Sequence, residues 1–141
     1  MTAEKHNGSV FLVAILVWIV FLAIAFGFGA IRELMLTPAI GESASHVIGT
    51  LAVVVAFLGV IFLFVRRYES LPSGTFWFVG VAWLAATIAF EFLFFHFASG
   101  KSWSDLLADY NVLRGRIWIL VPLTTLLGPP LLHQVFELKQ R

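Results

Sequence analysis

Four long apolar stretches, separated by short polar segments, restrict what this chain can fold into more than any other feature. They cover residues 9–30, 46–65, 75–97 and 117–136. A helix needs about 20 apolar residues to cross the hydrocarbon core of a bilayer, and it satisfies its own backbone hydrogen bonds there. The pattern predicts an all-α polytopic membrane protein in which four transmembrane helices form a bundle.

Composition supports a membrane location and excludes several classes of function. Hydrophobic residues make up 60% of the chain and charged residues only 12%, whereas soluble domains carry about 25% charged residues. A net charge of +1 without a clustered basic face argues against a nucleic-acid partner. The absence of cysteine excludes disulfides, thiolate metal sites and cysteine nucleophiles. We expect a single integral membrane domain over residues 1–141, with the lipid bilayer as its main partner.

The segment between the third and fourth stretches has a pattern of its own. Trp103, Leu106 and Tyr110 fall on one face of a helix. Ser102 precedes them, with Asp105 three positions later, as in a capping box. This pattern predicts a short amphipathic helix over residues 102–113 that lies in the membrane interface. An ordinary solvated loop is the alternative.

Basic residues near the ends of the stretches set the expected orientation. The first stretch exceeds the roughly 7–15 apolar residues of a secretory signal, so we expect it to remain as an uncleaved anchor. Four spans place both termini on the side of the Arg66-Arg67 turn. That side carries five basic residues against four on the other: Lys5, Arg66, Arg67, Lys139 and Arg141 against Arg32, Lys101, Arg114 and Arg116. Because basic residues are enriched in cytoplasmic segments, both termini are expected in the cytoplasm.

Glu91 is the only formally charged residue inside any of the four stretches. A carboxylate at that depth is unstable unless it is paired, protonated or in contact with water. We predict that Glu91 belongs to a buried polar cluster whose other members are Arg32, Glu33, His96, Asp109, Tyr110, Arg114 and Arg116. An arginine is the expected partner because a guanidinium grips a carboxylate bidentately and stays charged. Arg32 and Arg116 are both placed to reach Glu91, and Arg116 is favoured because it heads the fourth stretch.

Two interpretations of this cluster remain open. In the first, an ion pair of Glu91 locks helix register. In the second, the cluster is a site: a proton or ion relay, a pocket for a lipid or quinone head group, or a metal site. Metal is the weakest of these, because Glu91 and His96 are not spaced to share a helix face. His46 and His96 are the only metal candidates on this side. No catalytic motif is present, so an enzyme is not the favoured interpretation.

The third stretch carries a small-residue face and, on the opposite side, a second distinct face. Ala82, Ala85, Ala86 and Ala89 lie on one side, and Gly80, Thr87 and Glu91 lie on the opposite side. Small residues allow close packing of helices in membranes, so this span is expected to have neighbours on both sides. In the fourth stretch, Pro122, Pro129 and Pro130 predict a kinked helix. Thr124 and Thr125 are available there to bond backbone groups.

Several short segments carry a resemblance to a known family. They are Arg32-Glu33-Leu34, Phe90-Glu91-Phe92, Ser102-Trp103, Leu106-Leu107, Asp109-Tyr110-Asn111, Leu113-Arg114-Gly115-Arg116 and Trp118. This series resembles a family of small, functionally uncharacterised four-span bacterial membrane proteins. The resemblance implies a bacterial inner-membrane location and no particular activity.

The function predicted from these features is that of a non-enzymatic accessory, assembly or structural subunit of a membrane complex. Its expected partners are other membrane subunits or a second copy of the chain. The alternative is a small transporter, or a lipid- or quinone-binding protein, in which Glu91 titrates. No cofactor is predicted apart from a bound lipid or quinone.

Overall fold

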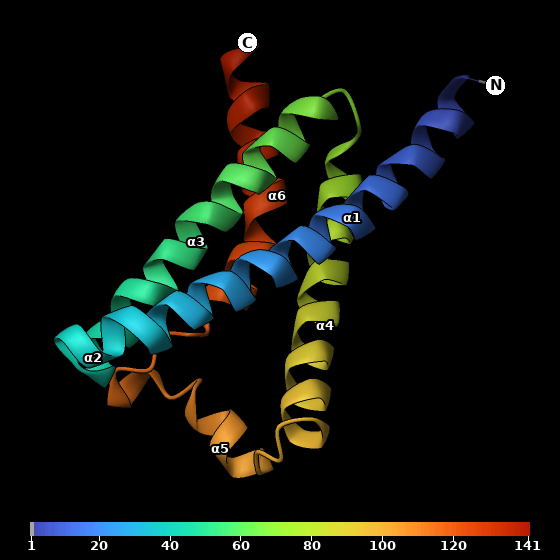
Figure 1. Ribbon diagram of the computed structural model, residues 1–141. Helices are drawn as coiled ribbons and strands as arrows, with labels where there is room; N and C mark the ends of the chain where they lie inside the picture. The colour runs from blue at the N-terminus through green and yellow to red at the C-terminus, as the bar shows by residue number, and fades with distance from the viewer. Residues whose placement is uncertain (1) are drawn as a thin grey trace.

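A computed structural model describes the backbone of residues 2–141 and the side chains of residues 8–141, and Figure 1 shows its helices in sequence. The Lys5 side chain, which the charge comparison counts, lies outside the described residues. The longer helices are α1 (Thr2–Ile31), α3 (Glu42–Arg67), α4 (Ser73–Phe97), α5 (Trp103–Ala108) and α6 (Leu120–Lys139). Shorter pieces are the π-helical turn η1 (Arg32–Leu36), α2 (Thr37–Ile40) and the 3₁₀ turn η2 (Val112–Arg114). No strand occurs within residues 2–141, so the prediction of an all-α chain is confirmed.

Three helical segments are long and apolar enough to cross a membrane: Gly8–Ile40, Glu42–Arg67 and Ser73–Phe97. The predicted stretches 46–65 and 75–97 lie inside the last two. The fourth predicted stretch corresponds to α6, which begins at Leu120 rather than at residue 117. The structure therefore supports a membrane protein with apolar helices.

The connection between the first two apolar stretches, residues 31–45, is mostly helical. The helix continues through η1 and α2 to Ile40, and Gly41, with φ of 87°, reverses the chain before α3. Thr37 donates its backbone N–H to the carbonyl of Arg32, five residues earlier. An α-helical bond would reach back four residues, so this turn is of the π type. Pro38 lies one residue later and has no N–H to donate. The π turn lets the chain accommodate that proline without ending the helix.

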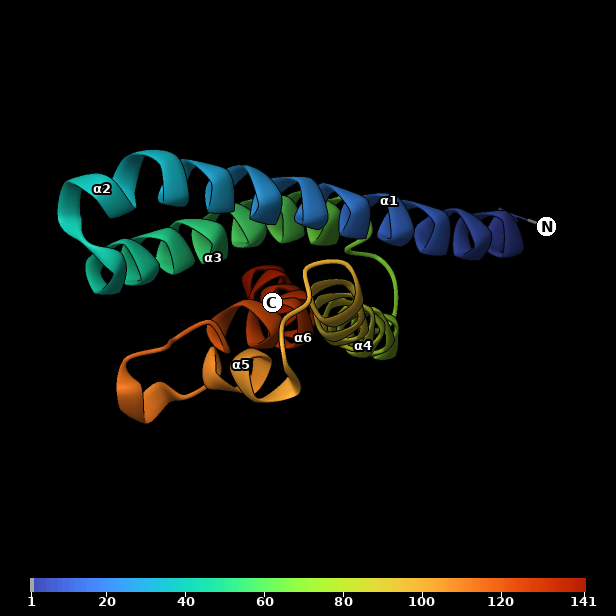
Figure 2. The ribbon, with the colours of Figure 1, turned by 60° about the horizontal axis from the view of Figure 1, so that its bottom comes forward.

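The helices form two layers (Figures 1 and 2). The first layer contains α1, α2 and α3, and the second contains α4, α5 and α6. Both ends of the chain lie at the same end of the molecule as the turn between α3 and α4. α2 and α5 lie at the opposite end.

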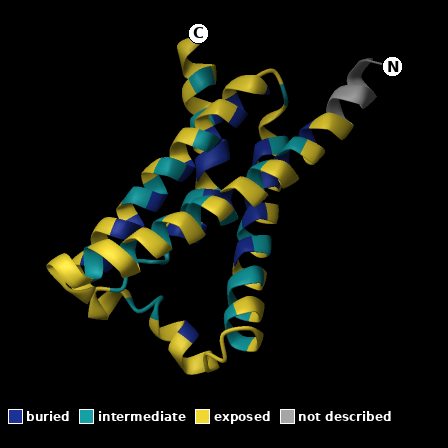
Figure 3. Ribbon diagram, in the orientation of Figure 1, coloured by how far each residue is buried: buried dark blue, intermediate teal, exposed yellow. Residues whose placement is uncertain are grey.

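Aromatic side chains fill the space where the layers meet, and most exposed residues lie on their outer faces (Figure 3). Phe21 of α1 stacks on Phe57 of α3, with ring centroids 4.3 Å apart, and meets the edge of Trp83 of α4 at 4.9 Å. The Trp83 indole donates to the carbonyl of Ala14 at 2.9 Å. Burial of an indole requires such an acceptor. These contacts hold α1 against both α3 and α4.

Gly80 allows α4 to approach α6 closely. A Cβ atom at Gly80 would lie 2.2 Å from the carbonyl oxygen of Leu126. That carbonyl would normally accept from residue 130, which is a proline without an N–H. The two helices therefore meet where one lacks a side chain and the other has a carbonyl without its usual α-helical donor.

The two faces predicted for α4 have different surroundings. Gly80 and Thr87 are buried, and Thr87 accepts a hydrogen bond from the Trp18 indole at 3.2 Å. On the opposite face Ala82, Ala85 and Ala89 are exposed. Both faces were expected to contact neighbouring helices. Within this chain, only the face of Gly80 and Thr87 does so.

The threonines of α6 bond to its own backbone. Thr124 donates to the carbonyl of Leu120 at 2.6 Å, and Thr125 donates to the carbonyl of Pro122 at 2.7 Å. Both hydroxyl groups therefore bond carbonyls in the first turns of this proline-containing helix, and not the carbonyls of Thr125 and Leu126 that lose their donors to Pro129 and Pro130.

The segment after α4 is less helical than predicted. Ser102 accepts from the backbone N–H of Asp105 at 3.2 Å, so the serine cap is present. The helix ends at Ala108 instead of continuing to residue 113, and Gly115 reverses the chain with φ of 78°. Only glycine adopts that left-handed conformation at little cost. The irregular path between Asp109 and Ile119 determines which side chains reach Glu91.

Candidate functional site

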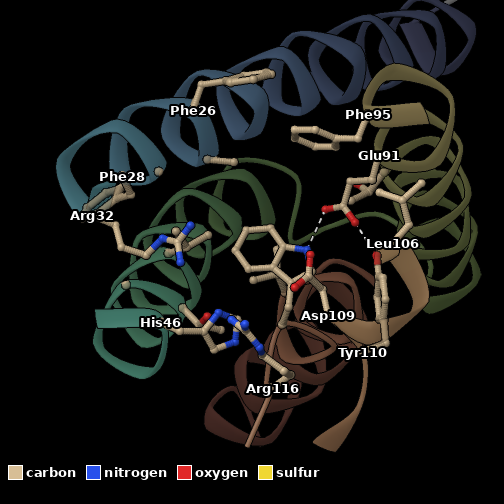
Figure 4. Close-up of a pocket in the computed structure, with 18 of the residues that line it drawn as sticks. Phe26, Phe28, Arg32, His46, Glu91, Phe95, Leu106, Asp109, Tyr110 and Arg116 are labelled. Carbon is tan, nitrogen blue, oxygen red and sulfur yellow. Dashed lines mark hydrogen bonds between the residues drawn. The ribbon is translucent and has the colours of Figure 1, made fainter. Parts of the chain in front are cut away.

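A pocket of about 810 Å³ lies between the two layers at the end that contains η1 and α5 (Figure 4). Residues of α1, η1, α3, α4 and α5 line it, together with Lys101 and several residues between 109 and 121. Its apolar wall consists mainly of aromatic rings: Phe21, Phe26, Phe28, Phe57, Phe90, Phe92 and Phe95. In Figure 4, Phe26 and Phe95 lie across the pocket from His46, Asp109 and Arg116. A volume of about 300–1,000 Å³ is usual for small-molecule sites.

Glu91 reaches into this pocket from α4 and is held by two donors. It accepts a hydrogen bond from the Trp118 indole nitrogen at 2.9 Å and another from the Tyr110 hydroxyl (Figure 4). One bond reaches each carboxyl oxygen, so both oxygens have partners. Glu91 therefore ties α4 to the irregular segment that follows α5.

The predicted ion pair between Glu91 and an arginine is wrong. Arg116 instead donates to Glu42 at 2.7 Å, and Arg32 pairs with its neighbour Glu33. The Arg32 side chain runs along α3, where its Cδ lies 3.1 Å from the position of a Cβ at Gly49. Arg32 and Arg116 each pair with a carboxylate of the layer that contains α1 and α3. Tyr110 and Trp118 instead reach Glu91 on α4.

Tyr110 packs as well as donates. Its ring stacks on Phe92, with centroids 5.8 Å apart. Burial and the neighbouring Glu91 carboxyl both raise the pKa of the Tyr110 phenol. The hydroxyl consequently remains a hydrogen-bond donor throughout the physiological pH range.

His46 of α3 is buried in the wall of the pocket, with 6% of its surface exposed. Its Nε2 atom is buried and has no hydrogen-bond partner among the described residues. Figure 4 shows the ring projecting from α3 toward Arg116. Buried polar atoms in proteins are nearly always bonded, so this nitrogen distinguishes His46 from the other polar residues of the pocket.

The structure brings together six of the eight residues predicted for the polar cluster. The six that line the pocket are Arg32, Glu33, Glu91, Asp109, Tyr110 and Arg116. Asp109 lies 3.8 Å from the Lys101 ammonium group. His96 lies outside, stacked on Trp103 with centroids 3.8 Å apart, and Arg114 is exposed.

Sequence reasoning missed two members of the site. Glu42 lies in the polar connection before the second apolar stretch, and Glu69 is equally close to that stretch at its other end, so proximity alone does not single out Glu42. Trp118 was visible only as an aromatic residue close to the start of the fourth stretch. The available signal was the indole N–H of Trp118, a hydrogen-bond donor expected on the same side of the membrane as the buried Glu91 carboxylate.

The histidines named as metal candidates do not lie in one cluster. His46 lines the pocket, and the Nδ1 atom of His96 lies 2.8 Å from the carbonyl oxygen of Lys101. Across the part of the chain that the structure describes, no group of three His, Cys, Asp or Glu residues is arranged to hold a metal ion.

Comparisons with protein families, curated proteins and solved structures find no match to this chain.

Proposed function

We propose that this protein binds an amphiphilic small molecule of the lipid or quinone class, which it takes from the bilayer into the pocket between its two layers. The supporting observation is the lining of that pocket, in which aromatic rings from apolar helices face a group of polar side chains. Such a lining matches a molecule with an apolar tail and a polar head. No arrangement for catalysis is part of this proposal.

A pocket-filling substitution tests this proposal. Ala25 of α1 lines the pocket, whereas Ala23 is exposed on the same helix. We expect Ala25→Phe to remove most of the lipid or quinone that co-purifies in mild detergent, because the new ring occupies the pocket. Ala23→Phe should retain it. Mass spectrometry of organic extracts measures both, and equal amounts of bound molecule in the two variants would contradict the proposal.

The bundle is proposed to have four spans, with α6 as the fourth. α6 has 20 residues, packs against α4 through Gly80, and runs back toward the end where the N-terminus lies. We further propose that α5 and η2 lie in the membrane interface, because Trp103, Leu107 and Leu113 expose apolar side chains there. A bacterial inner membrane with cytoplasmic termini fits the basic-residue count and the family resemblance.

Cysteine labelling tests this topology, since the chain has no cysteine of its own. Ser70, Ser99 and Gln140 are all exposed and can be replaced singly. With a membrane-impermeant maleimide on intact cells, we expect Ser99→Cys to label and Ser70→Cys and Gln140→Cys to label only after permeabilisation. Labelling of Gln140→Cys together with Ser99→Cys would show that α6 does not cross the membrane.

An accessory or assembly subunit is the second candidate. The observation that favours it is the exposed alanine face of α4, formed by Ala82, Ala85 and Ala89. Small residues of this kind allow another transmembrane helix, from a partner or a second copy, to approach closely. A stoichiometric protein partner that co-purifies equally with wild type and Ala25→Phe would favour this candidate.

A further inference from the structure

The basic residues at the two ends of the molecule differ in their partners. At the end that contains η1 and α5, Arg32, Lys101 and Arg116 each form an ion pair with a carboxylate. At the opposite end, α3 and α6 finish with four exposed basic residues: Arg66, Arg67, Lys139 and Arg141. Among the side chains of residues 8–141, none of these four forms an ion pair. The acids of the same two segments are Glu69 and Glu137, so cations are in excess there.

Two of these cations lie on one part of the surface because the helices that carry them are in contact. α3 and α6 both run toward this end of the molecule (Figure 1). The rings of Phe62 of α3 and Phe136 of α6 pack with centroids 5.4 Å apart. Arg66 follows Phe62 by four residues, and Lys139 follows Phe136 by three. Residues at these spacings are neighbours on a helix face, so both cations lie about one turn beyond the ring contact.

Buried contacts hold the ends of α3 and α6 together. The His133 ring of α6 is buried and donates from Nε2 to the backbone carbonyl of Glu69, in the turn after α3, at 3.0 Å. The same ring stacks on Phe76 of α4, with centroids 4.2 Å apart. Arg66 and Lys139 therefore extend from a fixed frame rather than from two independent chain ends.

Exposed apolar side chains lie beside these cations on both helices, among them Phe62, Leu63 and Leu138. Cations at a membrane surface, next to apolar groups, match the phosphate and the acyl chains of an anionic lipid. We infer that the ends of α3 and α6 bind an anionic phospholipid, with its phosphate between Arg66 and Lys139 and its acyl chains along the exposed apolar side chains. This inference rests on the proposed membrane position of the two helices and is independent of the ligand in the pocket.

The first test compares two lipids with the same acyl chains on the purified protein in mild detergent. Dioleoyl phosphatidylglycerol is anionic, and dioleoyl phosphatidylcholine is zwitterionic. We expect native mass spectrometry to show tighter binding of the phosphatidylglycerol, and the preference should persist in Ala25→Phe, in which the pocket is filled. Equal binding of the two lipids would overturn the inference. A preference that Ala25→Phe abolishes would place the anionic lipid in the pocket, which would overturn this site and leave the proposed function standing.

The second test distinguishes a site from general attraction between charges. We expect Arg66→Gln and Lys139→Gln each to weaken phosphatidylglycerol binding about fivefold, and the double variant about 25-fold. Arg114→Gln is the control, because Arg114 is exposed at the opposite end and should not contribute. All three residues are exposed, so the melting temperature without added lipid should not change. An equal loss of binding in Arg114→Gln would overturn the site.

The third test distinguishes a lipid from a soluble anion. Glycerol phosphate carries a phosphate group without acyl chains. If the exposed apolar side chains contribute to binding, an excess of glycerol phosphate should leave phosphatidylglycerol binding unchanged. Full competition by glycerol phosphate would show a site for soluble phosphates and contradict the assignment of a lipid.

Discussion

Gly80→Ala should destabilise the protein by about 1–3 kcal/mol, the usual range for overpacking a helix contact. The new Cβ would lie 2.2 Å from the Leu126 carbonyl oxygen, far inside contact distance. Because that atom belongs to the backbone of α6, a side-chain rotation cannot relieve the overlap. The two helices would have to separate, which would open the core beside Trp83. Thermal unfolding in detergent, followed by circular dichroism, measures the loss.

Gly59→Ala is the matched control for this prediction. Gly59 lies in the middle of α3, and nothing approaches the position of its Cβ within 4 Å. Alanine has the higher helix propensity, so this variant should be neutral or more stable by up to about 1 kcal/mol. Equal effects at the two glycines would mean that α4 and α6 do not meet at Gly80.

The hydrophobic pattern predicts the position of a helix well where the helix must be apolar along its length to lie in a bilayer. The apolar stretches 46–65 and 75–97 lie within α3 and α4, which extend only a few residues beyond them. The pattern does not indicate the helix over residues 31–40, which lies in the polar connection that contains Pro38. A π turn carries the helix past that proline. Such a turn depends on one shifted hydrogen bond and leaves no periodic signal in the sequence.

The position of the candidate site was predictable, but its bonding was not. Glu91 was identified because a lone carboxyl in an apolar helix requires partners. Which donors supply them depends on the path of the chain between Asp109 and Ile119, and this path turns at Gly115. Tyr110 and Trp118 lie 19 and 27 residues from Glu91. No helical periodicity relates such positions, so a preference for arginine based on chemistry alone chose the wrong partner.

The bonding of Glu91 explains how one carboxyl can shape the pocket. Its two donors come from the segment between α5 and α6, which forms one wall opposite α1 and α3. Without these bonds, that segment would be held to α4 mainly by the stacking of Tyr110 on Phe92, next to α5, whose Trp103 stacks on His96. The pocket wall therefore depends on a partly buried hydrogen-bond network rather than on an apolar core.

Double-mutant cycles should show coupling between Glu91 and its hydrogen-bond donors. We expect Glu91→Gln, Tyr110→Phe and Trp118→Phe each to destabilise the protein, with coupling of about 0.5–3 kcal/mol between Glu91 and the donor whose acceptor oxygen is lost, the range of hydrogen bonds to neutral and charged groups. Glu91→Gln should also increase hydrogen exchange over residues 109–119, because the amide nitrogen replaces one acceptor oxygen. Arg116→Gln is the control: it breaks only the bond to Glu42, so its effect should add to that of Glu91→Gln within about 0.5 kcal/mol. Strong coupling to Arg116, with additive effects at Tyr110 and Trp118, would restore the ion pair and contradict the observed network.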